Sequence, residues 1–477
     1  MRARVTGTRL VLALATGLIV AVAGCGNGGD SSAQPAEPSA GQWKTWVLSW
    51  GSEIEVPPPP AAGSEAASRD LEQLEQAVSS RTPNQEDEAR HWDEQPAMAP
   101  WMEDAMEFVS QRPKDPPYSS RAYAYVAVAI YDAAVSAWSW KQRYAREAPS
   151  EDPLVEAPPD PSYPSEHAAI AGAASRVLHY LFPEHPAQRL DQDAQQAAQS
   201  RVKAGVAYPS DVQAGLDLGR QVADRVIAYA RTDGISRQWD GTRPPHTPAY
   251  WDPPPGSAAR PVEPLAGAWR TWVIGSPERF QPPPPPRYRS PRFMKGVQRV
   301  ISAEDNLTPV QKEAALFWAG GQGTPLPAGI WEGVIVNYLR DRNLTTPEAA
   351  RVFALASVAM ADAGVAAWAT KYKWWYPRPE NSIRDTGADP KWKPLVPTPF
   401  FPAYTSGHAT YSAAVAQVLS YLFPEDTDDW HQKASQAAKA RIWGGIHWPW
   451  DSAAGLRQGE RVGDLVVAHA KADGADQ

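Results

Sequence analysis

Residues 414–426 read AVAQVLSYLFPED. Apolar side chains recur in this stretch at positions i, i+3, i+4, i+7 and i+8, namely Val415, Val418, Leu419, Leu422 and Phe423. Because an α-helix turns once every 3.6 residues, this spacing places all five on one helix face. Two further segments, 350–368 and 456–469, have the same helical character, and β-branched alternation is scarce. The sequence therefore predicts an all-α protein.

The same stretch occurs twice. RVLHYLFPEH at residues 176–185 matches QVLSYLFPED at residues 417–426, and QWKTWV at 42–47 matches AWRTWV at 268–273. Two copies of this length indicate an internal duplication. We expect two tandem helical bundles, each formed by one copy.

Composition shifts then divide the chain. The predicted parts are a lipoprotein signal peptide at 1–25, a flexible tether at 26–42, an N-terminal repeat at 43–240, a Pro-rich linker at 241–268 and a C-terminal bundle at 269–474. Gly, Ser and Pro dominate the tether, and Pro-rich stretches are typical of extended connections.

The N-terminus has the pattern of an export signal. Basic residues precede an apolar run that ends in Val-Ala-Gly-Cys25, and Cys25 is the only cysteine. This resembles a bacterial lipoprotein signal, in which the cysteine is lipidated, although a plain secretory signal is the alternative. The expected location is the extracytoplasmic side of the cell membrane, with membrane contact through the lipid anchor only.

The charge pattern excludes one class of partner. The net charge is −8 and no basic block occurs. A nucleic-acid partner is not expected, because nothing would neutralise a phosphate backbone.

Three polar clusters in the second copy are candidates for chemistry. In the first, KYKWWYPRP, Lys371 and Arg378 lie at a helix end and in the loop after it, where both can converge on one anion. Taken alone, this pair favours the alternative of ordinary surface cations.

The second cluster is Ser406-Gly407-His408, just before the helical stretch described above. Ser406 can cap that helix, and Gly407 lets a ligand approach the backbone. The free N–H groups of a helix N-terminus bind anions, and His408 could exchange protons with such an anion. The alternative is an ordinary capped helix with a surface histidine.

The third cluster is RIWGGIHWPWD, residues 441–451. Two glycines between Arg441 and His447 indicate a tight turn. Asp451 is expected to cap the next helix and could orient His447 by accepting its ring N–H. A packed loop with a buried histidine is the alternative.

Taken together, the three clusters resemble one superfamily. The order Lys-x6-Arg-Pro, Ser-Gly-His and Arg-x5-His-x3-Asp is similar to the type 2 phosphatidic acid phosphatases and the vanadium-dependent haloperoxidases. The residues around these motifs resemble the haloperoxidase branch. The stretches concerned are DAGVAAWATKYKWWYPRP (362–379), FPAYTSGHAT (401–410) and LTPVQKEAALFWAGGQGTPLPAGIW (307–331). The resemblance is clearest over 305–460 and implies two packed helical bundles, with the active site in the C-terminal one.

The resemblance also implies a role for each residue. Those that would bind the oxygens of vanadate are Lys371, Arg378, Ser406, Gly407 and Arg441. His408 would act as acid and base, His447 would be the axial ligand of vanadate, Asp451 would support His447, and Phe401 would lie near the halide. The sequence departs from the family pattern at Thr405, usually Pro, and at Ala440, usually Ser, which puts only the fine geometry in doubt.

The first copy retains only part of this set. Lys141, Ser165, His167, Arg201 and Asp211 have counterparts in the site. Ala148, Glu166 and Ala207 stand where the second copy has Arg378, Gly407 and His447. A carboxylate at the anion position repels vanadate or phosphate. We therefore expect the first copy to be a degenerate scaffold, and a separate function of His167 is left open.

Vanadate and phosphate share charge and shape, so three functions stay open. The first is a vanadate-dependent peroxidase acting on hydrogen peroxide, a halide and a small organic acceptor. The second is a phosphatase that needs no cofactor and cleaves a phosphate ester through a phospho-His447 intermediate. The third is a non-catalytic oxyanion-binding lipoprotein. The sequence around the three motifs favours the first function.

Overall fold

The computed structural model describes residues 38–93, 96–111, 115–149, 153–156, 159–253 and 260–476. Throughout these ranges the regular secondary structure is helical, and no strand occurs. The prediction of an all-α fold is therefore confirmed. Cys25, the signal peptide and the tether up to residue 37 lie outside the described residues.

The first half contains seven α-helices and one 3-10 helix among its described residues. They are η1 (Pro38–Gln42), α1 (Glu65–Ser79), α2 (Pro83–Asp93), α3 (Ala99–Gln111), α4 (Pro116–Tyr144), α5 (Glu166–Leu181), α6 (Ala187–Lys203) and α7 (Pro209–Ala230).

The second half runs from η2 to α15. Its helices are η2 (Ala266–Ala268), η3 (Pro277–Phe280), α8 (Pro291–Asp305), α9 (Pro309–Phe317), α10 (Leu326–Arg340), α11 (Thr346–Trp374), α12 (Pro379–Asp385), α13 (Gly407–Leu422), η4 (Pro424–Asp426), α14 (Thr427–Trp443) and α15 (Pro449–Ala470).

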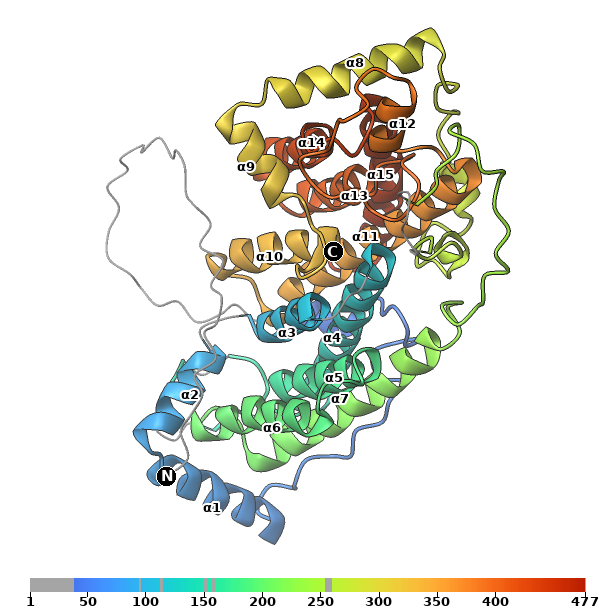
Figure 1. Ribbon diagram of the computed structural model, residues 1–477. Coiled ribbons are helices and arrows are strands. Elements are labelled where there is room, and N and C mark those ends of the chain that lie inside the picture. The colour runs from blue at the N-terminus through green and yellow to red at the C-terminus, as the bar shows by residue number, and fades with distance from the viewer. Residues whose placement is uncertain are drawn as a thin grey trace. The chain divides into compact units, whose positions relative to one another are not determined.

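Two long helices, α4 and α11, form the centre of the fold. They pack against each other, α4 also packs against α5 and α7, and α11 packs against α13 and α15 (Figure 1). Helix α11 is long and apolar enough to cross a membrane, yet 94% of its most apolar window is buried inside the protein. This burial is what a core helix shows.

The central helices receive the same contacts in both halves. Asp132 on α4 accepts hydrogen bonds from the backbone N–H groups of residues 46–48, and Asp362 on α11 accepts them from residues 272–274. Each carboxylate thereby satisfies three donors of the segment that enters its half. These matching contacts agree with the predicted internal duplication, which remains a proposal.

Helices α13 and α15 approach closely through glycine. A Cβ at Gly459 of α15 would lie 2.2 Å from the backbone oxygen of Thr410 of α13. In the first half, a Cβ at Gly219 of α7 would lie 1.9 Å from the backbone oxygen of Ala169 of α5. No side chain fits at these distances, so both helix pairs depend on glycine. In the second half this contact fixes the N-terminus of α15 beside that of α13, which positions the site.

Two segments predicted as connections contain residues that pack against the fold. Residues 38–42 form η1, in which Ala40 is buried and Gly41 lies against Ser139 of α4, so the tether prediction is wrong for these five residues. In the Pro-rich segment, Trp251 is buried and its backbone N–H donates to the oxygen of Trp375, 2.5 Å away. The segment is thus attached to the end of α11.

Candidate active site

The end of α11 places the first two cations. Lys371 lies in the last turn, and Trp375 closes the helix in the left-handed conformation, with φ 46°. The chain then turns back, and Arg378 immediately precedes α12. The helix-to-loop change predicted between Lys371 and Arg378 is therefore present, and both side chains are buried, contrary to the surface alternative.

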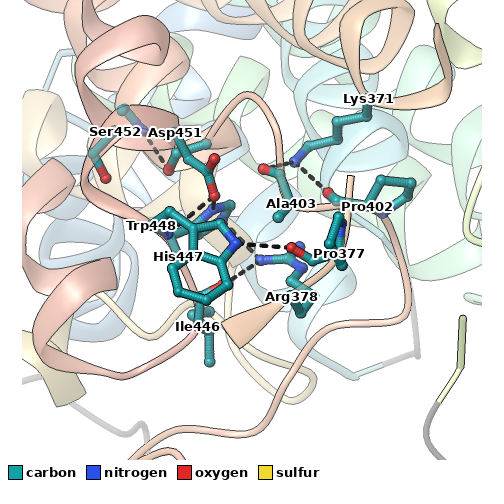
Figure 2. A network of polar contacts seen from close by, with 12 residues as sticks. Lys371, Pro377, Arg378, Pro402, Ala403, Ile446, His447, Trp448, Asp451 and Ser452 are labelled. Atoms are coloured by element: carbon teal, nitrogen blue, oxygen red, sulfur yellow. Dashed lines mark hydrogen bonds and ion pairs between the residues drawn. The ribbon is translucent and has the colours of Figure 1, made fainter. Parts of the chain in front are cut away.

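Backbone carbonyls from two loops hold these cations. Lys371 Nζ donates to the oxygens of Pro402 (2.8 Å) and Ala403 (3.1 Å). Arg378 donates through Nε to the oxygen of Phe401 (2.9 Å) and through Nη1 to that of Ile446 (2.8 Å). Figure 2 shows both side chains among these partners.

The Ser406-Gly407-His408 cluster forms the start of α13, as predicted. Ser406 is the N-cap, and its side chain accepts from the N–H of Ala409 at 3.5 Å. The first N–H groups of α13 have no partner within the helix, which makes this end a site for negative charge. Ser406 and Gly407 are buried, whereas His408 is partly exposed.

The third cluster joins α14 to α15. Gly445 has φ +76°, and a Cβ there would lie 2.9 Å from Trp392, so the predicted tight turn requires glycine. His447 Nδ1 lies 3.0 Å from Asp451 Oδ2, the pairing expected from the sequence. The other expectation is wrong in detail, because Trp448 is the N-cap of α15. Asp451 is its third residue and accepts from the Trp448 N–H.

The three clusters meet around His447. Arg378 Nη1 lies 2.9 Å from His447 Nε2, so the guanidinium donates to this nitrogen when Nδ1 donates to Asp451. Arg441, at the end of α14, donates from Nη1 to the oxygen of Trp318 at 2.7 Å. Figure 2 shows His447 between Asp451 and Arg378.

Burial and mutual repulsion shift the pKa values of the site. Burial, followed by the charge of Arg378, lowers the pKa of His447 and of Lys371 well below their usual values. Burial lowers the pKa of Arg378 and of Arg441 to about 9, so both remain charged at pH 7. Burial raises the pKa of Asp451 to about 7, against the opposing effect of its hydrogen bond and the nearby cations. The carboxylate of Asp451 therefore does not balance the positive charges of Arg378 and Arg441 within the site.

Besides Asp451 Oδ1, three buried nitrogen atoms of this site lack a hydrogen-bond partner. They are Arg378 Nη2, Arg441 Nε and His408 Nε2. A buried donor without a partner is costly, and unpaired donors on converging cations are suited to an oxyanion. The residues present thus fit a tetrahedral oxyanion such as vanadate or phosphate. The candidate residues with charged or imidazole side chains all lie in this one cluster. This arrangement differs from the alternatives in which each motif is an unrelated surface or packing feature.

A small apolar cavity opens beside the cradle. It is lined by Pro116, Pro327, Trp368, Pro399, Phe401, Gly407, His408, Tyr411, Ile446 and His447. The ring of Phe401 lies 5.0 Å from that of Trp368, with Lys371 Nζ at 5.1 Å and the Arg378 guanidinium at 4.9 Å. Phe401 therefore lines the cavity and lies close to both cations, and its role near a halide remains a proposal.

Sequence reasoning missed several residues of this cavity. Trp368 precedes Lys371 by three residues and so shares its helix face, a spacing that could have identified it. Pro116 comes from the start of α4 in the first half and carries no local signal. The tryptophans that flank the motifs, such as Trp448 and Trp450, do not line the cavity. The Trp448 ring stacks on that of Trp450 at 5.3 Å instead.

The first half neutralises its own version of the cradle. Lys141 pairs with Asp160 at 2.5 Å, Arg201 pairs with Asp93 at 2.6 Å, and Glu166 accepts from the Trp138 indole N–H. Carboxylates of the chain itself thus pair with these two cations, in the place that an external anion would take. Burial lowers the pKa of His167 well below its usual value, with the charge of Arg201 next.

Part of the second bundle matches the model of a known protein family. Residues 351–432 and 426–473 match the model of the VCPO second helical-bundle domain. This part of the C-terminal bundle is thus similar to the second helical-bundle domain of that family. Vanadium chloroperoxidase of Curvularia inaequalis is 32% identical over 162 residues, which are 29% of this chain and 26% of the relative. The matched part thus spans about a quarter of that relative's length.

Solved structures extend the haloperoxidase likeness to most of the chain. A bacterial vanadium-dependent iodoperoxidase is 25% identical, with a TM-score of 0.64 over 78% of this chain and 95% of its own. A bacterial vanadium-dependent chloroperoxidase in its holo form is 17% identical, with a TM-score of 0.58 over 76% and 93%. The second likeness concerns the fold alone. All the charged residues and histidines of the cradle, from Lys371 to Asp451, lie within the range matched by the family model.

Proposed function

We propose that the chain is a vanadate-dependent haloperoxidase that oxidises a halide with hydrogen peroxide. The observation that carries the proposal is the pair of buried, unpartnered donors Arg378 Nη2 and Arg441 Nε, together with the unpartnered Nε2 of His408, around His447. Lys371 adds a third cation. Such a set supports binding of a doubly or triply charged oxyanion much better than of a neutral ligand.

Each residue has a role that follows from its position. Lys371, Arg378 and Arg441 would bind the oxygens of vanadate, together with Ser406 and the N–H of Gly407. His447 would ligate vanadate through Nε2, because Nδ1 is held by Asp451. Arg378 Nη1 now occupies the direction of Nε2, so it would turn from His447 to the oxyanion on binding.

Protons are handled by His408. Its Nε2 is unpartnered, and burial, with the charge of Arg441 next, lowers its pKa well below the usual value. A neutral imidazole beside a bound oxyanion can accept a proton from hydrogen peroxide and return it to a leaving oxygen. Bound vanadate would supply the Lewis acidity that activates peroxide toward a halide.

The cavity beside Phe401 is the proposed place of the halide. It leads to both His408 and His447, and its walls are aromatic rings and prolines. Apolar walls of this kind would limit the access of water to the halide. A small organic acceptor is proposed as the final recipient of the halogen.

The phosphatase alternative uses the same cradle, with His447 as the nucleophile and no cofactor. The match to the haloperoxidase family model favours the peroxidase. An oxyanion-binding protein without catalysis would have no use for His408 as well as His447.

One experiment separates these functions. The purified chain, preloaded with orthovanadate, is supplied with peroxide, bromide and a dye whose bromination is followed by absorbance. We expect vanadate-dependent turnover that His447→Ala abolishes and that His167→Ala, the matched change in the first half, leaves intact. Absence of halide oxidation at every vanadate concentration, together with vanadate-inhibited hydrolysis of a phosphomonoester, would replace the peroxidase by the phosphatase.

We also propose that the chain is exported and anchored at Cys25, on the sequence pattern of residues 1–25 alone. Cell fractionation tests this. Cys25→Ser should move the chain from the membrane fraction to the soluble extracytoplasmic fraction, and an unchanged distribution would contradict the anchor.

A further inference from the structure

We propose that Gln458 on α15 is a positioning residue of the oxyanion cradle. Its amide connects the helix that carries Lys371 to the loop that carries Ser406. The inference rests on the proposed function, because it concerns the same oxyanion site. It adds a group that does not touch the oxyanion itself.

The contacts of this amide are complete and buried. Gln458 Oε1 accepts from Thr405 Oγ1 at 2.6 Å, and Nε2 donates to the oxygen of Ala366 at 3.0 Å and to Thr370 Oγ1 at 2.9 Å. The Thr370 hydroxyl donates to the oxygen of Ala366 at 3.0 Å and so can only accept from Gln458. A reversed amide would place its oxygen against a carbonyl, so the orientation is fixed.

Both threonines are direct neighbours of cradle residues. Thr370 precedes Lys371, and Thr405 precedes Ser406, the N-cap of α13. The loop before α13 is therefore attached to α11 in two places: through Gln458, and through the bonds of Lys371 Nζ to Pro402 and Ala403.

The second attachment uses donors of the cradle itself. Lys371 Nζ has three N–H donors, and two of them bind these carbonyls, which leaves one for an oxyanion. Without the bridge through Gln458, any shift of the loop would redirect the third donor and the N-terminus of α13 together. Functional groups keep their geometry when neighbouring hydrogen bonds fix them, and Gln458 supplies such bonds.

The first half shows that the helices pack without this amide. Gly215 and Gly219 match Gly455 and Gly459, and the position between them that corresponds to Gln458 is Leu218. The positions matching Thr405 and Thr370 are Pro164 and Trp140. Leu218 is buried between helices that pack in the same way, yet that half has lost the counterparts of Arg378 and His447. The amide bridge therefore occurs with the site rather than with the fold.

The test compares two variants that break the bridge with two that do not. Gln458→Leu introduces the first-half residue, and Thr405→Val removes the hydroxyl at nearly constant volume. Thr405→Ser keeps the hydroxyl. Gln417→Leu removes another amide between α13 and α15, whose exposed Nε2 donates to Asp464 at 2.8 Å.

The readout is binding, measured by calorimetry on the full chain with orthovanadate and, separately, inorganic phosphate. Melting temperatures are recorded alongside. We expect Gln458→Leu and Thr405→Val to weaken orthovanadate binding by about 10- to 100-fold, the usual effect of losing a residue that orients a ligand-binding group. Thr405→Ser and Gln417→Leu should bind as the wild type does.

Other results would overturn the inference. Lower melting temperatures of Gln458→Leu or Thr405→Val with wild-type binding would make the bridge purely structural. Should Gln458→Leu not fold, Thr405→Val decides the question alone. A wild-type chain that binds neither anion would refute the proposed function and the inference together, whereas wild-type binding that the two bridge variants retain refutes only the inference.

Discussion

Replacing Arg378 by lysine tests the cradle most directly, because the charge is kept and only the planar fork is lost. Arg378 makes two bonds to carbonyls, at 2.9 and 2.8 Å, and leaves Nη2 for an anion. A lysine ammonium is a compact point charge and cannot reach all three directions. A hydrogen bond to a charged group contributes about 1.5–3 kcal/mol. Loss of the bond to the anion should therefore weaken orthovanadate binding about 10- to 140-fold, at about 1.4 kcal/mol per tenfold.

The assay is calorimetric titration of Arg378→Lys with orthovanadate, accompanied by denaturant unfolding. Loss of one carbonyl bond should also lower the free energy of unfolding by about 1.5–3 kcal/mol. Arg351→Lys is the matched control, because Arg351 is a buried arginine of α11 that pairs with Asp473 at 2.7 Å, away from the cradle. It should lose stability and keep orthovanadate affinity. Equal affinity of wild type and Arg378→Lys, or equal loss in both variants, would refute the reasoning.

Three further changes test the packing and electrostatics. Burial raises the pKa of Glu332 to about 8 from 4.5, so its contribution to stability is complete below pH 4.5 and is lost as pH rises through 8. Urea unfolding of Glu332→Gln should match the wild type at pH 4.5 and exceed it by up to about 5 kcal/mol at pH 9, and a constant difference would contradict this. Gly459→Ala places a Cβ 2.2 Å from the oxygen of Thr410 and should cost at least about 1–3 kcal/mol of stability, so an unchanged melting temperature would show that α15 can shift. Asp362→Asn leaves at least one of three backbone N–H groups without its acceptor and should cost about 1–3 kcal/mol, as should Asp132→Asn. A large loss in only one of the two aspartate variants would contradict their equivalence.

The helices and their order could be predicted because the signals are local. The 3.6-residue pattern of 414–426 identified α13, and the unbroken apolar run of 350–368 identified the core of α11. The N-cap of α13 was also predicted correctly, since Ser406 bonds three residues ahead. Asp451 was misplaced as an N-cap because a capping box and a simple cap share the same residue types, and only the backbone distinguishes them.

By itself, the sequence determined that this chain is helical and that its second half carries the motifs of an oxyanion site. Both conclusions depend on residue types at short, fixed spacings. Only the tertiary structure decided how Arg378 meets His447 across 69 positions and how Gln458 bridges Thr405 across 53. It also decided that Pro116 of the first half completes the cavity. Those contacts arise from the packing of α4, α11, α13 and α15, which is set by burial and close glycine contacts between distant segments rather than by any local pattern.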